Sequence, residues 1–243
     1  MIREAGTLYV YETPGDVAKA LADLFIRYAV SAIDGSGRFV VSLAGGTTPK
    51  ATYSMFAKAP YASAIDWSAV DIFFGDERCV PPDNEQSNYK MAFEAFIGPL
   101  GISDSQVHRM RGEDDPQQAA IAYRGVLFDE LGEQPSFDLV MLGIGPDGHT
   151  ASLFPGEDPL TDNQEKVRAV YATSHEQWRL TLTPSVFNAA QAVVFAATGA
   201  EKADVIGLVR QGSYDPITLP AQIIAPNDGE LIWLVDKAAA GKP

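Results

Sequence analysis

The chain has 243 residues, and its formal net charge of −14, with no basic stripe, argues against nucleic-acid binding and against attachment to an acidic membrane surface. Apolar residues make up 46% of the chain, but there is no run of about 18 of them and no signal-peptide pattern near the start, so we expect a globular protein without a membrane span. The single cysteine, Cys79, excludes an internal disulfide framework and favours a cytoplasmic location.

Segments typical of strands and helices alternate along the chain. Apolar residues recur at helical spacing within residues 16–33, whereas nearly every residue of 137–142 is apolar, as in a strand buried on both faces. The alternation predicts one α/β domain over residues 1–243, a doubly wound and mostly parallel Rossmann-like sheet with helices on both faces and room for a small extra lobe. The predicted strands are 7–11, 37–43, 68–74, 107–110, 137–142, 167–173, 179–182, 192–198 and 231–235, and the predicted helices are 16–33, 49–57, 88–96, 116–132 and a segment after Gly199.

The loop AGGTTPK joins the second predicted strand to the second predicted helix. Thr48 is a natural N-cap and Pro49 suits the first helical position, so this helix should present free backbone N–H groups. Such an N-terminus attracts anions, Gly45 and Gly46 leave room for a phosphate, and Thr47 and Thr48 add hydroxyl donors. The local residues leave two alternatives open, a phosphate site and a tight turn with an ordinary cap.

Three charged residues, Asp76, Glu77 and Arg78, directly follow the predicted strand 68–74. Ligands of an open parallel sheet lie beyond the carboxyl ends of its strands. We therefore favour a role at a binding site over idle, solvated side chains, and we expect Asp76 and Arg78 to contact the substrate. Cys79 has no histidine near it in the sequence, so it is predicted to be a small buried side chain and not a nucleophile.

The segment FDLVMLGIGPDGHTASLFPG, residues 137–156, begins as a buried strand and continues as a loop that contains Asp147 and His149. Its glycines form the pattern Gly-x-Gly-x-x-Gly, which in a dinucleotide site needs a long helix directly after the third glycine. Pro155 comes too early for such a helix, and Asp147 would put a carboxylate where the pyrophosphate should lie. We therefore expect no dinucleotide and no other cofactor. One histidine and one aspartate also fall short of a metal-ligand set, so no metal is expected.

Two basic residues later in the chain are candidates for binding an anion. Arg179 lies in a predicted strand, and its planar guanidinium can bind a phosphate bidentately. Lys202 follows Gly199 near a predicted helix start, an arrangement similar to the AGGTTPK loop. For both residues a solvated surface charge is the alternative, and His108, alone on a short edge strand, is expected to be structural.

Together, LAGGTTPK, FFGDERCVPPDNEQSNY, LGIGPDGHTASLFPG, RLTLTP and GAEKAD resemble 6-phosphogluconolactonases of the type related to glucosamine-6-phosphate deaminases. The resemblance runs from about Thr7 to Val235. It implies hydrolysis of 6-phospho-D-glucono-1,5-lactone to 6-phosphogluconate in the oxidative pentose phosphate pathway. A small sugar phosphate lactone is then the expected partner, and we expect a monomer.

The resemblance also assigns roles to residues. It implies that His149 is the catalytic base and that Asp147 supports and orients the site. The loop from Gly45 to Thr48, with Arg179 and Lys202, matches the phosphate-binding positions, and Arg78 matches an arginine that contacts the substrate. Ala44 departs from the family pattern, in which serine is common, and this weakens any claim that a hydroxyl is needed there.

The residues fit ester hydrolysis by an activated water, because a neutral histidine is a suitable base near pH 7 and no Gly-x-Ser-x-Gly motif indicates a serine esterase. Two other functions stay open. Amino-sugar-phosphate deaminases share the phosphate loop, but they typically carry a tyrosine where this chain has Arg78, and an Asn-Glu-Pro-like continuation where it has SLFP. Non-catalytic sugar-phosphate sensors are usually attached to a DNA-binding module, and this chain shows no basic N-terminal module.

Overall fold

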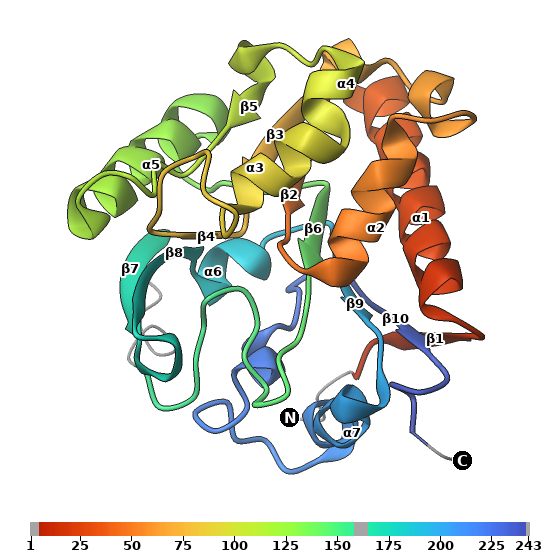
Figure 1. The fold of residues 1–243 in the computed structure, drawn as a ribbon, viewed down its shortest axis with the longest axis vertical. Helices are drawn as coiled ribbons and strands as arrows, with labels where there is room; N and C mark the ends of the chain where they lie inside the picture. The colour runs from red at the N-terminus through yellow and green to blue at the C-terminus, as the bar shows by residue number, and fades with distance from the viewer. Residues whose placement is uncertain (1–4, 158–164, 242–243) are drawn as a thin grey trace.

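The computed structural model describes residues 5–157 and 165–241, and its frame is a seven-stranded sheet in which all neighbouring strands are parallel (Figure 1). The strand order β1-β10-β9-β6-β2-β3-β5 confirms the predicted α/β fold. The strands are β1 (Thr7–Tyr11), β2 (Phe39–Leu43), β3 (Val70–Phe74), β5 (Val107–His108), β6 (Leu139–Leu142), β9 (Ala192–Ala197) and β10 (Glu230–Asp236).

Helices cover both faces of this sheet (Figure 1). They are α1 (Pro14–Ser36), α2 (Thr47–Phe56), α3 (Asn88–Ala92), α4 (Gly98–Leu100), α5 (Pro116–Leu131), α6 (Pro184–Phe187) and α7 (Ala203–Gln211), with a π-helical turn, Phe93–Ile97, between α3 and α4. Alternate residues of a central strand point to opposite faces, so Leu139 and Met141 of β6 belong to one core while Val140 and Leu142 belong to the other. The first core includes residues of α1, α2 and α3, and the second includes residues of α5, α6 and α7.

A second, three-stranded antiparallel sheet forms the small extra lobe, in the order β4 (Asp76–Arg78), β8 (Gln177–Leu182) and β7 (Val167–Ala172). The segment Asp76–Arg78 was not among the predicted strands, and the structure corrects this. Three charged residues have no strand signal of their own, and the segment becomes a strand because β8, far along the chain, pairs with it. Leu180 and Leu182 of β8 join the core on the α5 face, so the two sheets share one core.

The helix and strand ends differ from the predictions in several places. Thr48 is not the N-cap of α2, since the helix begins at Thr47 and is preceded by Gly46, whose φ of 104° is natural only for glycine. The predicted strand 107–110 is reduced to β5, and the predicted helix 88–96 continues through the π-helical turn to Leu100. None of the helices in the described residues combines the length and the hydrophobicity that a membrane crossing needs.

The order of the strands locates a switch point in the sheet. The chain runs outward from β2 through β3 to β5, returns to β6, and then runs outward through β9 to β10. Connections therefore leave the neighbours β2 and β6 in opposite directions. Doubly wound sheets bind their ligands at this place, beyond the carboxyl ends of the strands.

Candidate active site

A cavity of about 250 Å³ opens at the switch point, between the loops that follow β2 and β6. Residues 44–49 line it from the first loop, and residues 143–145 line it from the second. Eight of the residues predicted for the site lie on its wall: Gly45, Gly46, Thr47, Thr48, Asp76, Arg78, His149 and Lys202. Asp147 and Arg179, also predicted, do not line the cavity, but Asp147 pairs with His149 and Arg179 lies opposite Arg78, which do.

Hydrogen bonds fix the start of the loop after β2, whereas the N-terminus of α2, at the end of this loop, is open to the cavity. Tyr53 of α2 donates its hydroxyl to the carbonyl of Ala44 at 2.9 Å and accepts the Ala44 N–H at 3.1 Å, which fixes the start of the loop. No side chain of residues 5–157 or 165–241 caps the N-terminus of α2, so the first backbone N–H groups of the helix are available to a ligand. Thr48 is buried, and its hydroxyl lies 3.2 Å from that of Thr198 at the end of β9.

Lys202 brings a positive charge to the same cavity from the connection between β9 and α7. Burial lowers its pKa, and nearby Glu201 only partly opposes this effect. No ion pair of Lys202 is found within residues 5–157 and 165–241. A half-buried ammonium group with no ion pair in the described residues is suited to binding an anion.

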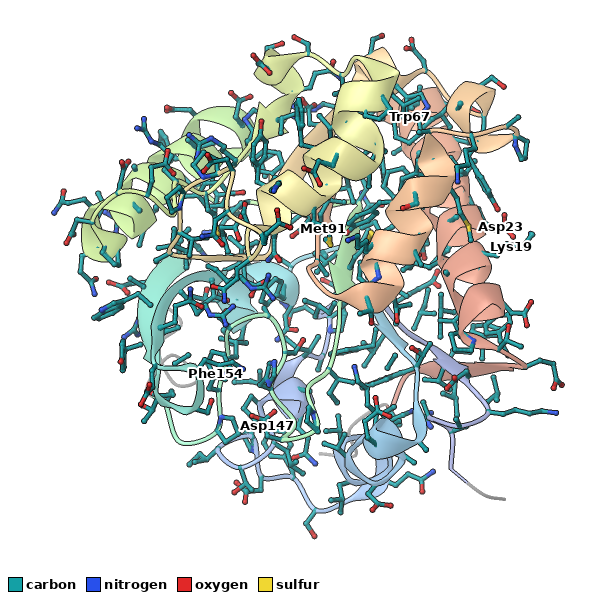
Figure 2. All side chains as sticks on the ribbon, in the orientation of Figure 1. Lys19, Asp23, Trp67, Met91, Asp147 and Phe154 are labelled. Carbon is teal, nitrogen blue, oxygen red and sulfur yellow. The ribbon has the colours of Figure 1, made fainter. Side chains whose placement is uncertain are left out.

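His149 and Asp147 form a close pair on the loop after β6 (Figure 2, where Asp147 is labelled). The His149 Nδ1 atom lies 2.6 Å from Oδ1 of Asp147, which also accepts the His149 backbone N–H at 3.1 Å. Burial alone would raise the pKa of the Asp147 carboxyl, but the hydrogen bonds from His149 hold it below its usual value. A carboxylate at Nδ1 favours the tautomer with the proton there, which leaves Nε2 as a free base.

Aromatic rings surround this imidazole. Phe154 packs against it with ring centroids 4.9 Å apart (Figure 2), and the His175 ring centroid lies 6.1 Å away. Burial lowers the pKa of His175, and the positive charge of Arg179 lowers it further. His175 lies in the turn between β7 and β8, a region in which the sequence offered no motif, so its approach to His149 was not predicted.

Arg78 and Arg179 lie side by side on the antiparallel strands β4 and β8. Arg78 donates to the carbonyl of Gln86 at 2.6 Å, and the Nε atoms of both arginines are buried with no hydrogen-bond partner among the residues that the structure describes. Burial lowers the pKa of Arg179, and the neighbouring charge of Arg78 adds to the effect. No salt bridge of either guanidinium is found in the described part of the chain. Two such groups beside the cavity form a second source of positive charge.

The two carboxylates of the Asp-Glu pair have different surroundings. Glu77 is buried and accepts the backbone N–H groups of Arg78, Asn88 and Tyr89 at 2.7–2.9 Å and the Ser87 hydroxyl at 3.0 Å, so it is structural. Asp76 lines the cavity, but Asn88 and Ser152 donate to its two carboxylate oxygens. Asn88 and Ser152 were not singled out in the sequence, because nothing marks them before the loops are folded.

Two further predictions concern Cys79 and His108. Cys79 is half-buried, and burial raises the pKa of its thiol to about 11, which does not suit a nucleophile. His108 stacks on Phe73 at 4.3 Å between ring centroids, on the outermost strand of the sheet, in keeping with a structural role. Within the described residues, no three His, Cys, Asp or Glu side chains gather closely enough to hold a metal ion.

Comparison with known proteins identifies the family. Residues 12–233 match the family described as glucosamine-6-phosphate isomerases/6-phosphogluconolactonase. A 6-phosphogluconolactonase of Synechocystis is 38% identical over 213 residues, 86% of each chain, and one of Rattus norvegicus is 38% identical over 97% of this chain and 93% of its own. The solved structure of 6-phosphogluconolactonase from Trypanosoma cruzi is 26% identical, with a TM-score of 0.89 over 98% of this chain and 97% of its own. The chain therefore belongs to the glucosamine-6-phosphate isomerase/6-phosphogluconolactonase family.

Proposed function

We propose that this protein is a 6-phosphogluconolactonase, which hydrolyses 6-phospho-D-glucono-1,5-lactone to 6-phospho-D-gluconate. The observation that carries the proposal is a single cavity that holds a carboxylate-paired imidazole together with an uncapped helix N-terminus and a half-buried lysine. The relatives that are 6-phosphogluconolactonases support the same activity.

The phosphate of the substrate binds at the N-terminus of α2 in this proposal. The free N–H groups of Thr47 and Thr48 and the ammonium of Lys202 surround it, and Arg179 reaches it from β8. A dianion there would offset the burial that lowers the pKa of Lys202 and Arg179, because a nearby opposite charge favours the charged form of both groups. Holding the substrate by its phosphate fixes the lactone carbonyl relative to His149, and orientation of this kind lowers a barrier by several kcal/mol, roughly 7–11 at most.

His149 acts as the general base. With its Nδ1 proton donated to Asp147, the Nε2 atom takes a proton from a water molecule while the water oxygen attacks C1 of the lactone. Asp147 keeps the ring in this tautomer and stabilises the imidazolium ion that forms. No covalent intermediate with the protein is needed.

The attack places negative charge on the carbonyl oxygen. Arg78, which faces the cavity without a salt bridge in the described residues, or the N–H groups of the loop after β6 stabilise this oxyanion. The bond between C1 and the ring oxygen then breaks, and His149 returns its proton to that oxygen. The products are a hydroxyl group and a carboxylic acid, which ionises at neutral pH.

We infer that the reaction serves the oxidative pentose phosphate pathway in the cytoplasm and that a monomer carries it out.

The test is to supply the phosphorylated lactone and follow acid release above the spontaneous rate. We expect hydrolysis by the wild-type protein, much weaker activity on the lactone without phosphate, and a loss of about a hundredfold or more in kcat for His149→Ala, the usual contribution of a general base. The control is His108→Asn, which changes a histidine at the far edge of the sheet and should keep the wild-type kcat.

Two results would contradict the proposal. Wild-type kcat in His149→Ala would remove the base assignment. Release of ammonia from glucosamine 6-phosphate, without lactone hydrolysis, would instead identify a deaminase.

A further inference from the structure

Asp76 lines the active-site cavity, yet other residues of the protein already bind both of its carboxylate oxygens. The Ser152 hydroxyl donates to Oδ2 at 2.8 Å, and the Asn88 side-chain amide donates to Oδ1 at 3.2 Å and to the Asp76 carbonyl at 2.9 Å. All three residues are buried, with 8% of Asp76, 2% of Asn88 and 1% of Ser152 exposed. Hydrogen bonds to a buried carboxylate are stronger than neutral ones, so this cluster is rigid.

One end of the cluster holds the turn that directly follows His149. Leu153 donates its N–H to the carbonyl of Thr150 at 2.9 Å, and between them Ala151 has a φ of 47°, a left-handed conformation that costs a non-glycine residue about 1–2 kcal/mol. Such strain persists only where the surroundings impose it. Ser152 is in this turn, and its hydrogen bond to Asp76 is one of the contacts that impose the conformation.

The other end of the cluster touches the loop after β2. A Cβ atom added at Gly45 would lie 2.1 Å from Oδ1 of Asn88, so the amide is in close contact with the loop backbone. Asn88 is itself fixed, because its backbone N–H donates to Glu77 at 2.7 Å. A continuous chain of buried contacts therefore runs from Gly45 through Asn88 and Asp76 to Ser152.

We propose that Asp76 is a positioning residue, which sets the distance between the loop that binds the phosphate and the turn that directly follows His149. This inference rests on the proposed function, which assigns phosphate binding to the loop at one end of these contacts and proton transfer to His149 beside the other end. Asn88 and Ser152 already bind both carboxylate oxygens of Asp76, so we assign to Asp76 the joining of the two loops and not the binding of the dianionic substrate. The imidazole and the phosphate must remain one sugar length apart, and an error of about 1 Å can cost about a hundredfold in rate.

The experiment compares kcat and KM of Ser152→Ala, Asp76→Asn and the double variant. Ser152 does not line the cavity, so its substitution cuts the link without removing a substrate contact. We expect each single variant to lose about tenfold to a hundredfold in kcat with KM changed by less than about twofold. The double variant should be no slower than the slower single, because both substitutions break the same link.

The matched control is Ser42→Ala, which removes an equally buried serine hydroxyl that has no hydrogen-bond partner in the described residues. It should keep the wild-type kcat and KM. If Ser152→Ala fails to fold, Ser152→Cys keeps the side-chain size with a weaker donor and should show the same loss of kcat at unchanged KM.

Three results would overturn the positioning role: a wild-type kcat in a folded Ser152 variant, a double variant whose loss is the product of the single losses, or a large rise of KM in Asp76→Asn alone. A readout without turnover separates this proposal from the function itself. The NMR signals of the His149 ring should shift in Ser152→Ala and Asp76→Asn but not in Ser42→Ala, even if the wild-type protein does not hydrolyse the lactone. Unshifted signals in all three variants would refute the link.

Discussion

At the residue scale, the His149–Asp147 pair depends on Gly145, because any larger residue there would take the space of the two side chains. A Cβ atom added at Gly145 would lie 2.1 Å from His149 Nδ1 and 2.6 Å from Asp147 Oδ1. Gly145 also donates its N–H to the carbonyl of His149 at 2.9 Å, which brings the two segments together. The middle glycine of the Gly-x-Gly-x-x-Gly pattern therefore makes room for an imidazole.

Gly145→Ala should consequently displace the imidazole. We expect kcat to fall about a hundredfold and the free energy of unfolding to fall by about 1–3 kcal/mol, as for other overpacked sites. Kinetics and urea unfolding measure the two effects. Gly125→Ala in α5 is the control, since its new methyl group meets nothing within 4 Å and should stabilise the helix by about 0.5–1 kcal/mol at unchanged kcat. Normal kcat in Gly145→Ala would show that the ring is not held as described.

The same pair predicts how stability varies with pH. The pKa of Asp147 is lower in the folded protein, so the carboxylate contributes stability above its unfolded pKa of about 4 and loses it as the pH falls through the folded value. Asp147→Asn should therefore be less stable than the wild type at about pH 7 and should lose less further stability between about pH 5 and 2. Urea unfolding across this range is the measurement, and parallel acid profiles for the two proteins would contradict the prediction.

At the scale of elements, Glu77 joins the small sheet to the N-terminus of α3. Its carboxylate accepts the N–H groups of Asn88 and Tyr89, the first two residues of the helix, from a position in β4. A buried side chain from another element thereby satisfies the helix end, which fixes the direction of α3 and with it the place of Asn88.

Glu77→Ala should lower the free energy of unfolding by about 3 kcal/mol or more, because it leaves several buried donors without an acceptor and opens a cavity. Chemical denaturation gives the value. Glu94→Ala nearby removes an exposed glutamate whose ion pair with Lys90 is long, 3.7 Å, and should change stability by less than about 0.5 kcal/mol. Similar effects of the two substitutions would mean that Glu77 is not a helix cap.

The sequence predicts those features that depend on neighbours in the chain. The hydrophobic pattern is local, so the strands of the large sheet were found within a few residues of their ends, and Asp147 meets His149 because they are two residues apart. The pairing of Arg78 with Arg179 depends on the register of two distant strands, and no local pattern encodes that register. The contacts of Asn88 and Ser152 with Asp76 were missed for the same reason.

The incorrect prediction of the start of α2 has a related physical cause. The sequence favoured Thr48 as an N-cap on side-chain chemistry, whereas the backbone turns at Gly46 through a positive φ and needs no capping side chain. A glycine can serve either as a spacer or as the turning residue, and only the folded loop distinguishes the two.

At the scale of the whole molecule, the two sheets are expected to unfold together. Leu180 and Leu182 of the small sheet lie in one core with Val140 and Phe195 of the large sheet, so this core is complete only when both sheets are folded. We propose that residues 1–243 are one cooperative domain and predict a single calorimetric transition. Trp178 on the small sheet and Trp233 on the large one report separately on the sheets. Their fluorescence midpoints should coincide in single-tryptophan variants, and two separate midpoints would contradict the proposal.

The position of β10 between β1 and β9 has a consequence for synthesis on the ribosome. β1 emerges first, as the uncharged segment TLYVY, and in the described structure its one hydrogen-bonded neighbour is β10, which is translated almost a full chain length later. Throughout that interval the nascent chain carries an unpaired strand without the charges that usually discourage association with other chains. A polypeptide that stops before Glu230 never acquires this neighbour, and it leaves β9 open on the same side.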